Sequence, residues 1–211
     1  MCNQLGDLIS MKKFIYAFVL LLPFFSALSQ ENKQAEATVN KYLDAVNLID
    51  FPEGKSIIRE YSWDVSSVNF PQIISYTKIF SSTFDTDVSG IQGYKQYLNM
   101  KVTSKGGFSL NKKYMIICYK SAKLGNWKVF GFREAIDVEL EVLGAKDRLT
   151  DTKYTKAQYN YRNYGYWLLM AGKPLEARKS FLKALELNGK NNSTSKDFSP
   201  HIHIANEILG M

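Results

Sequence analysis

Residues 161–189, YRNYGYWLLMAGKPLEARKSFLKALELNG, predict two helices that fold back on each other as a hairpin. Gly172 stands where a left-handed residue closes the first helix, and Pro174 suits the first position of the second helix. Gly189 then closes the second helix. Apolar residues on one face of that helix recur at steps of four and three, at Ala177, Phe181 and Ala184.

Large and small residues alternate along this stretch with a regular spacing. The large residues are Tyr161, Tyr164, Leu168 and Phe181, and the small residues are Gly165 and Ala177. This spacing resembles a tetratricopeptide repeat, a helical hairpin of about 34 residues. The resemblance covers about residues 158–191, with tyrosine at position 161 in place of the usual tryptophan and glycine at 189 in place of proline. It implies that the small residues let the two helices approach closely.

The resemblance also implies a binding surface, because the first helix of each repeat lines the concave face in that family. Carried over to this chain, the partner-binding residues are Tyr159, Arg162, Asn163 and Tyr166. The partner implied is a protein or a peptide. The alternative is that the aromatic residues of this helix pack against the rest of the chain. We favour that alternative for Tyr154 and Trp167, and both readings stay open for Arg162 and Tyr166.

The N-terminal residues have the features of a secretory signal peptide. Two lysines follow Met11, then comes an apolar run at residues 14–25, and small residues precede Gln30. The run holds 12 residues, which is short of the ~20 that a membrane-spanning helix needs. We therefore expect residues 1–29 to be removed, with the true start at Met11, and a bacterial protein that is periplasmic or secreted. An uncleaved membrane anchor is the alternative.

Composition limits the remaining possibilities. The chain of 211 residues has a net charge of +7, with scattered lysines and no nucleic-acid-binding motif, so we expect no nucleic-acid partner. Removal of residues 1–29 would leave Cys118 as the last of two cysteines, so the mature chain forms no internal disulfide. Cys118 lies in an apolar segment, and we predict that it is buried.

The middle of the chain predicts an α+β unit over residues 30–134. Val39, Leu43 and Val46 repeat at helical steps near its start, and a short helix follows over residues 55–61. Residues 69–86 are either extended or loosely helical, and residues 91–102 fit a further helix. Two strands, over residues 114–120 and 126–133, form a hairpin around turn residues at 121–126. A helix placed before a late hairpin of the form IICYK…GNWKVFGF resembles the ketosteroid-isomerase-like and cystatin-like domains.

No group of residues in this sequence has the spacing of a catalytic or metal site. The available acids and phenols, among them Asp85 and Tyr97, show no mutual spacing. His201 and His203 lie two positions apart and have no third ligand nearby. We expect a protein that is not an enzyme and has no cofactor and no metal.

The predicted fold class is therefore α+β, with a helix-plus-antiparallel-sheet domain followed by a helical region over residues 135–211. A helix over residues 134–149 leads into the hairpin, with its acids facing water and Leu140 and Leu143 on its apolar side. Ser199 and Pro200 begin a last helix that caps the hairpin. The leading hypothesis is an exported interaction protein that docks a protein or peptide in the cell envelope. The alternative is a ligand-binding or isomerase/hydrolase-like α+β domain that the helices support.

Overall fold

The computed structural model describes residues 29–63, 72–103, 107–150, 157–189 and 199–211. Apart from Ser29, the predicted signal segment lies outside these residues, as do Tyr154 and the polar stretch at 190–197. Within the described part of the chain, none of the helices combines the length and the apolar character needed to cross a bilayer.

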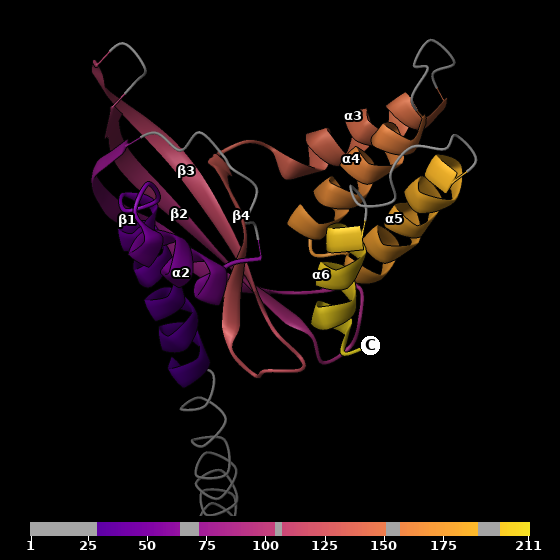
Figure 1. Cartoon of the computed structure of the whole chain (residues 1–211), viewed down its shortest axis with the longest axis horizontal. Helices are drawn as coiled ribbons and strands as arrows, with labels where there is room; N and C mark the ends of the chain where they lie inside the picture. Colours follow the sequence, from indigo (N-terminus) through magenta and orange to yellow (C-terminus); the bar gives the residue numbers. More distant parts are fainter. Residues whose placement is uncertain (1–28, 64–71, 104–106, 151–156, 190–198) are drawn as a thin grey trace, which may run out of the picture.

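Helices at both ends of the chain enclose a central antiparallel sheet, which makes the fold α+β as predicted (Figure 1). The N-terminal helix covers residues 29–46. The elements that follow it are α2 (Pro52–Tyr61), β1 (Gln72–Asp85), β2 (Gln92–Thr103), β3 (Ser109–Lys120), β4 (Trp127–Glu134), α3 (Val138–Thr150), α4 (Ala157–Met170), α5 (Pro174–Gly189) and α6 (Ser199–Leu209). The strands form a meander in the order β1-β2-β3-β4.

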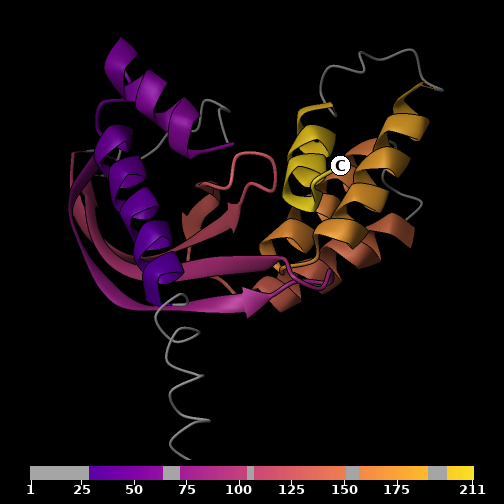
Figure 2. The same cartoon turned by 90° about the horizontal axis from the view of Figure 1, so that it is seen from below.

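The first core lies between the N-terminal helix, α2 and one face of the sheet (Figure 2). Val39, Leu43 and Val46 are buried there, as their helical spacing predicted. On the sheet side they meet Leu98, Ile116 and other buried side chains of β2, β3 and β4. Cys118 belongs to this core and is fully buried, so its predicted role as a small apolar residue is confirmed.

The predicted helix over residues 91–102 is wrong, because this segment is strand β2. Every second residue of the strand is buried, at Tyr94, Gln96, Leu98, Met100 and Val102. The period of two is the signature of a strand with one covered face. Buried Gln96 hides this period in the sequence, where a polar residue suggests exposure. Its side-chain oxygen accepts a hydrogen bond from the Tyr94 hydroxyl at 2.8 Å.

The predicted hairpin of β3 and β4 is confirmed, with Gly125 in the left-handed conformation at φ 69° in its turn. The undecided residues 72–85 form the edge strand β1, which pairs with β2 through two irregularities. These bulges shift which side chains face inward, and Ile74, Ile79 and Phe80 are exposed. The sequence of β1 therefore lacks a clean alternation.

The second core lies on the other face of the sheet, where α4, α5 and α6 pack. Its sheet side is formed by Met115, Ile117, Tyr119 and Phe130, and its helical side includes Trp167, Phe181 and Ile208. The Tyr119 hydroxyl donates a hydrogen bond to the Leu169 carbonyl within this core. The predicted α+β unit, residues 30–134, and the predicted helical region, residues 135–211, thus share this second core.

Helix α3 differs from its prediction in which side is covered. We expected Leu140 and Leu143 to face the protein, but they are 64% and 56% exposed. Ala145 is buried instead, and Val138 and Val142 pack at the margin of the second core. These three residues also follow helical steps of four and three, so the sequence offered two apolar stripes on one helix.

Candidate functional site

The α4–α5 hairpin ends its first helix as predicted. Gly172 has a φ of 80°, its N–H donates to the Leu169 carbonyl, and the Lys173 N–H donates to the Leu168 carbonyl. This pair of bonds is a Schellman motif, which requires a left-handed residue at position 172. Pro174 is the first residue of α5.

The N-terminus of α5 is capped by a residue far away in the sequence. The carboxylate of Asp87, in the turn between β1 and β2, accepts hydrogen bonds from the N–H groups of Leu175 and Glu176 at 3.1 and 3.0 Å. The Asp87 N–H donates to the Gly172 carbonyl at 3.1 Å. A carboxylate at this position satisfies free N–H groups and interacts favourably with the helix dipole. The β1–β2 turn therefore fixes the start of α5.

Close contact between α4 and α5 depends on Gly165. A Cβ atom at this position would lie 2.5 Å from Cε1 of Phe181, which is closer than carbon atoms can approach. Phe181 and Ala177 are fully buried. The packing roles expected for these three residues agree with the structure.

Tyr166 faces the sheet. Its ring lies 5.3 Å from the ring of Phe130, and its hydroxyl accepts a hydrogen bond from Nε of Arg133 at 2.6 Å. The Arg133 guanidinium also stands over the rings of Tyr166 and Trp167, at 4.4 and 5.1 Å from their centroids. Trp167 is buried in the second core, as we favoured. Tyr166 is therefore a half-buried contact between α4 and β4.

The other three predicted binding residues lie nearer the N-terminus of α4. Asn163 is exposed, whereas Tyr159 and Arg162 are half-buried. The Arg162 guanidinium stands 5.1 Å from the centre of the Tyr159 ring. Because residues three and four apart share a helix face, these residues continue the line of Tyr166 along α4. The structure thus brings the four residues into one stripe whose C-terminal end is attached to the sheet.

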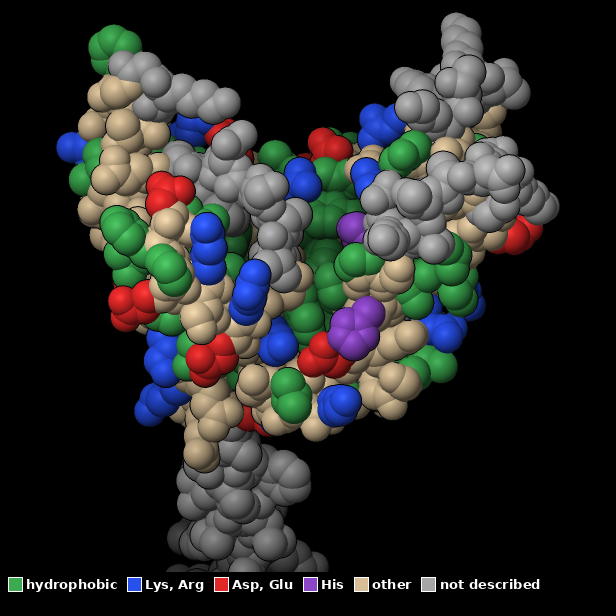
Figure 3. Space-filling view, in the orientation of Figure 1, with side chains coloured by type: hydrophobic (Ala, Val, Ile, Leu, Met, Phe, Trp, Pro, Cys, Tyr) green, Lys and Arg blue, Asp and Glu red, His purple; other side chains and the backbone are tan. Residues whose placement is uncertain are grey.

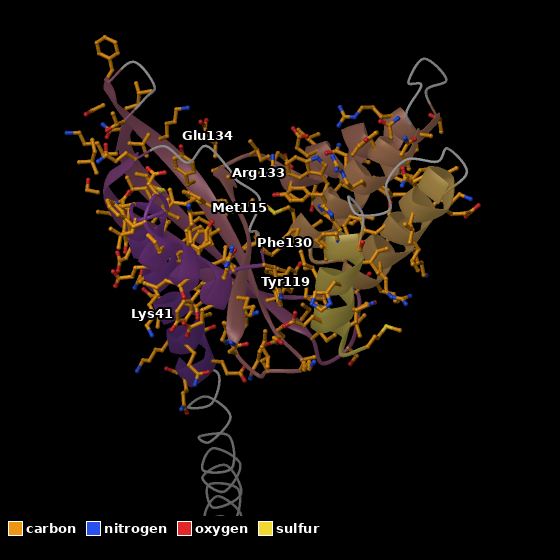
Figure 4. The ribbon with its side chains drawn as sticks, in the orientation of Figure 1. Lys41, Met115, Tyr119, Phe130, Arg133 and Glu134 are labelled. Atoms are coloured by element: carbon orange, nitrogen blue, oxygen red, sulfur yellow. The ribbon has the colours of Figure 1, made fainter. Side chains whose placement is uncertain are left out.

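The two halves of the molecule enclose a hollow with hydrophobic side chains on its floor (Figure 3). The histidines of α6 lie on its helical side. Phe130 and Arg133, both on β4, lie on the side of the sheet that is turned toward the helices (Figure 4). Two aromatic rings and a guanidinium thus meet where the α4 stripe reaches the sheet. Aromatic and arginine side chains are the types that contribute most to protein interfaces.

Glu207 on α6 connects three parts of the chain. Its carboxylate accepts hydrogen bonds from Nε1 of Trp63 and Oγ of Ser121, both at 2.8 Å. Nζ of Lys128 and Nε2 of His203 lie 3.9 and 3.7 Å away. Burial by itself raises the pKa of this carboxyl, but the two hydrogen bonds and the neighbouring cations outweigh it and hold the pKa below its ordinary value. This network joins α6 to the sheet and to the end of α2.

Most acids and phenols of the middle region have separate structural roles. Asp87 caps α5, and Tyr119 is buried, which raises its pKa. Tyr94 is buried in the first core, where burial raises its pKa to about 12. Asp85 and Tyr97 both line an open cleft between the sheet and α3. Asp64 lies outside the described residues.

His201 and His203 both lie on helix α6. His201 packs against Phe181 with ring centres 5.3 Å apart, and His203 is near Glu207. Among the described residues, no three histidine, cysteine, aspartate or glutamate side chains are close enough to hold a metal ion.

Sequence reasoning missed Arg133, Asp87 and Glu207. Each acts through a contact with a segment more than 30 positions away, and no local pattern marks such a residue. The comparison of this chain with protein-family models, with curated proteins and with solved structures gave no match.

Proposed function

We propose that this protein is a non-enzymatic interaction protein of the cell envelope. It docks a protein or peptide partner along α4, through Tyr159, Arg162 and Asn163. The main support is the division of the α4 stripe: Arg133 holds its Tyr166 end against the sheet, while Asn163, about one turn earlier along the helix, faces water. A rigid helix that presents adjacent aromatic, guanidinium and amide groups is suited to binding a polar peptide surface.

The resemblance of the hairpin to a tetratricopeptide repeat supports the same proposal. In that family the first helix of a repeat contributes to the binding face, and here that helix is α4. Export through the predicted signal segment would place the protein in the envelope. Tyr166 contributes by positioning the stripe, since its ring and hydroxyl are engaged with β4.

The test is site-specific crosslinking in the producing cell. A photoreactive amino acid replaces Asn163 in one variant and Lys179, an exposed residue of α5, in the control. We expect one defined protein adduct from position 163, lost when Arg162→Glu is added, and no such adduct from position 179. Identical adducts from both positions, or none from position 163, would exclude α4 as the docking surface. Circular dichroism of each purified variant establishes that it is folded.

A further inference from the structure

A cleft of about 760 Å³ lies between the sheet and α3, apart from the α4 stripe. Its floor comes from β1, β2 and β3, and its wall from the start of α3 and the segment before it. The apolar residues that line it include Phe84, Tyr97, Ile117, Val138, Val142 and Leu143. This volume is within the range of small-molecule sites, roughly 300–1,000 Å³.

Large apolar side chains are exposed to solvent along the margins of the cleft. Leu143 in the wall and Leu140 beside it are more than half exposed. On the sheet side Phe80, 50% exposed, stacks on Tyr97 with ring centres 4.5 Å apart. Adjacent exposed apolar residues around a concavity are typical of a surface that binds an apolar group.

The floor of the cleft contains a single lysine. Lys95 of β2 is half-buried, and in the sheet it stands between Ser82 of β1 and Ile117 of β3. Among the described residues, its ammonium group has no hydrogen bond and no ion pair. An ammonium group without a partner at the floor of an apolar cleft can pair with the negatively charged group of a bound ligand.

Most other charged groups at the cleft are already engaged. Asp85 accepts a hydrogen bond from Gln92 at 3.3 Å, and Asp137 accepts from the N–H groups of Glu139 and Leu140 at the start of α3. Lys173 pairs with Glu176 at 3.6 Å. The Glu139 side chain is exposed at the wall. Lys95 is thus the cation that remains available on the floor.

We infer that this cleft binds a single-chain amphiphile with a carboxylate head group, such as a fatty acid. The hydrocarbon chain lies against Tyr97, Val142 and Leu143, where it covers exposed apolar surface. The carboxylate reaches the floor and pairs with the Lys95 ammonium. Lys95 lies on the floor, where a slender ligand can reach it. A protein surface that covers only the margins of the cleft cannot, so we favour the slender ligand.

The test is calorimetric titration of the full chain with dodecanoate below its micelle concentration, and with dodecanol as the uncharged analogue. Lys95→Met removes the charge and keeps an unbranched side chain of similar length. We expect it to weaken dodecanoate binding by about tenfold or more, the effect of one charge-assisted hydrogen bond, and to leave dodecanol binding unchanged. The matched control is Lys101→Met, an exposed lysine on the same face of β2 outside the cleft, which should bind both ligands like the parent.

A second variant tests the apolar part of the site. Val142→Trp places a large ring where the hydrocarbon chain would lie and should weaken binding of both ligands, with the melting temperature showing that the variant is folded. Failure of the parent to bind dodecanoate overturns the inference, as does equal binding by the parent and Lys95→Met. Equal loss in Lys95→Met and Lys101→Met would show unspecific attraction to a basic surface and also overturns it. None of these outcomes bears on the α4 surface.

Discussion

Two glycines within helices of this protein differ in how much space surrounds them: Gly165 is tightly packed and Gly144 is not. A Cβ at Gly165 would meet the buried ring of Phe181 at 2.5 Å, whereas a Cβ at Gly144 of α3 would have no atom within 4 Å. Helix propensity favours alanine over glycine at both positions by about 1 kcal/mol. We therefore expect Gly144→Ala to raise the free energy of unfolding by about 0.5–1 kcal/mol and Gly165→Ala to lower it by about 1–2 kcal/mol.

Urea denaturation of the two variants and the parent measures this difference. The two substitutions are chemically identical, so propensity cancels in the comparison and the packing against Phe181 remains. Equal effects at both positions would show that the hairpin does not need glycine at 165.

A second prediction at this scale concerns Glu207 and pH. Because its pKa is lowered in the folded state, the carboxylate stabilises the protein above the pKa of the unfolded chain, near 4.5. This stabilisation is lost as the pH falls through the folded-state value. Glu207→Gln should lower the free energy of unfolding by about 1–2 kcal/mol at pH 7, where two hydrogen bonds lose their charged acceptor.

The comparison to make is the difference in melting temperature between parent and Glu207→Gln from pH 7 to pH 3. We expect this difference to shrink below pH 4.5, since the carboxyl is then protonated first in the unfolded chain and, at lower pH, in the folded protein as well. A difference that stays constant across this range would mean that the charge of Glu207 does not contribute. Glu186→Gln, an exposed change on α5, serves as the control.

At the scale of elements, the start of α5 depends on the β1–β2 turn. Asp87→Ala removes the acceptor for two helix N–H groups and should cost about 0.5–2 kcal/mol of stability. Asp85→Ala, two residues earlier, removes one long hydrogen bond at an exposed side chain and should cost less than about 0.5 kcal/mol. Thermal unfolding of both variants checks the prediction, and equal destabilisation would contradict the cap.

Elements with local signals were predictable from the sequence. The hairpin of α4 and α5 has Gly172 and Pro174 at its turn, and the β3–β4 hairpin has Gly125, so chain geometry fixes both. Strand β2 was mistaken for a helix because Gln96, a polar residue, occupies a buried position. The orientation of α3 was mistaken because two apolar stripes were available, and only packing against α4 in the second core selects Val138, Val142 and Ala145.

The α4 stripe shows the same division. The positions of Tyr159, Arg162, Asn163 and Tyr166 on one helix face follow from their spacing. The attachment of Tyr166 to the sheet depends on Arg133, which lies in a different segment. The cleft at Lys95 forms only where three strands of the sheet meet the start of α3. Residues from distant segments meet only in the folded chain, so these features have no sequence pattern.

At the scale of the whole molecule, the sheet has one core on each face, and both cores contain residues of β3 and β4. We expect a single cooperative unfolding transition for this reason. Trp127 belongs to the first core and Trp167 to the second, so each can report on its own core. Variants that retain only one of them, with the other two tryptophans changed to phenylalanine, should show coincident denaturation midpoints for fluorescence and circular dichroism. A tryptophan signal that changes before the circular dichroism would show that the cores unfold separately.

The order of the elements along the chain has a consequence for biosynthesis. The sheet is complete at residue 134, but the helices that cover Met115, Ile117, Tyr119 and Phe130 come later, and α6 comes last. At roughly 5–20 residues per second, a ribosome needs about 4–15 s to add residues 135–211. During that interval the nascent sheet presents an uncovered apolar face to its surroundings. A chaperone that shields this face until release would therefore protect the newly made chain from aggregation.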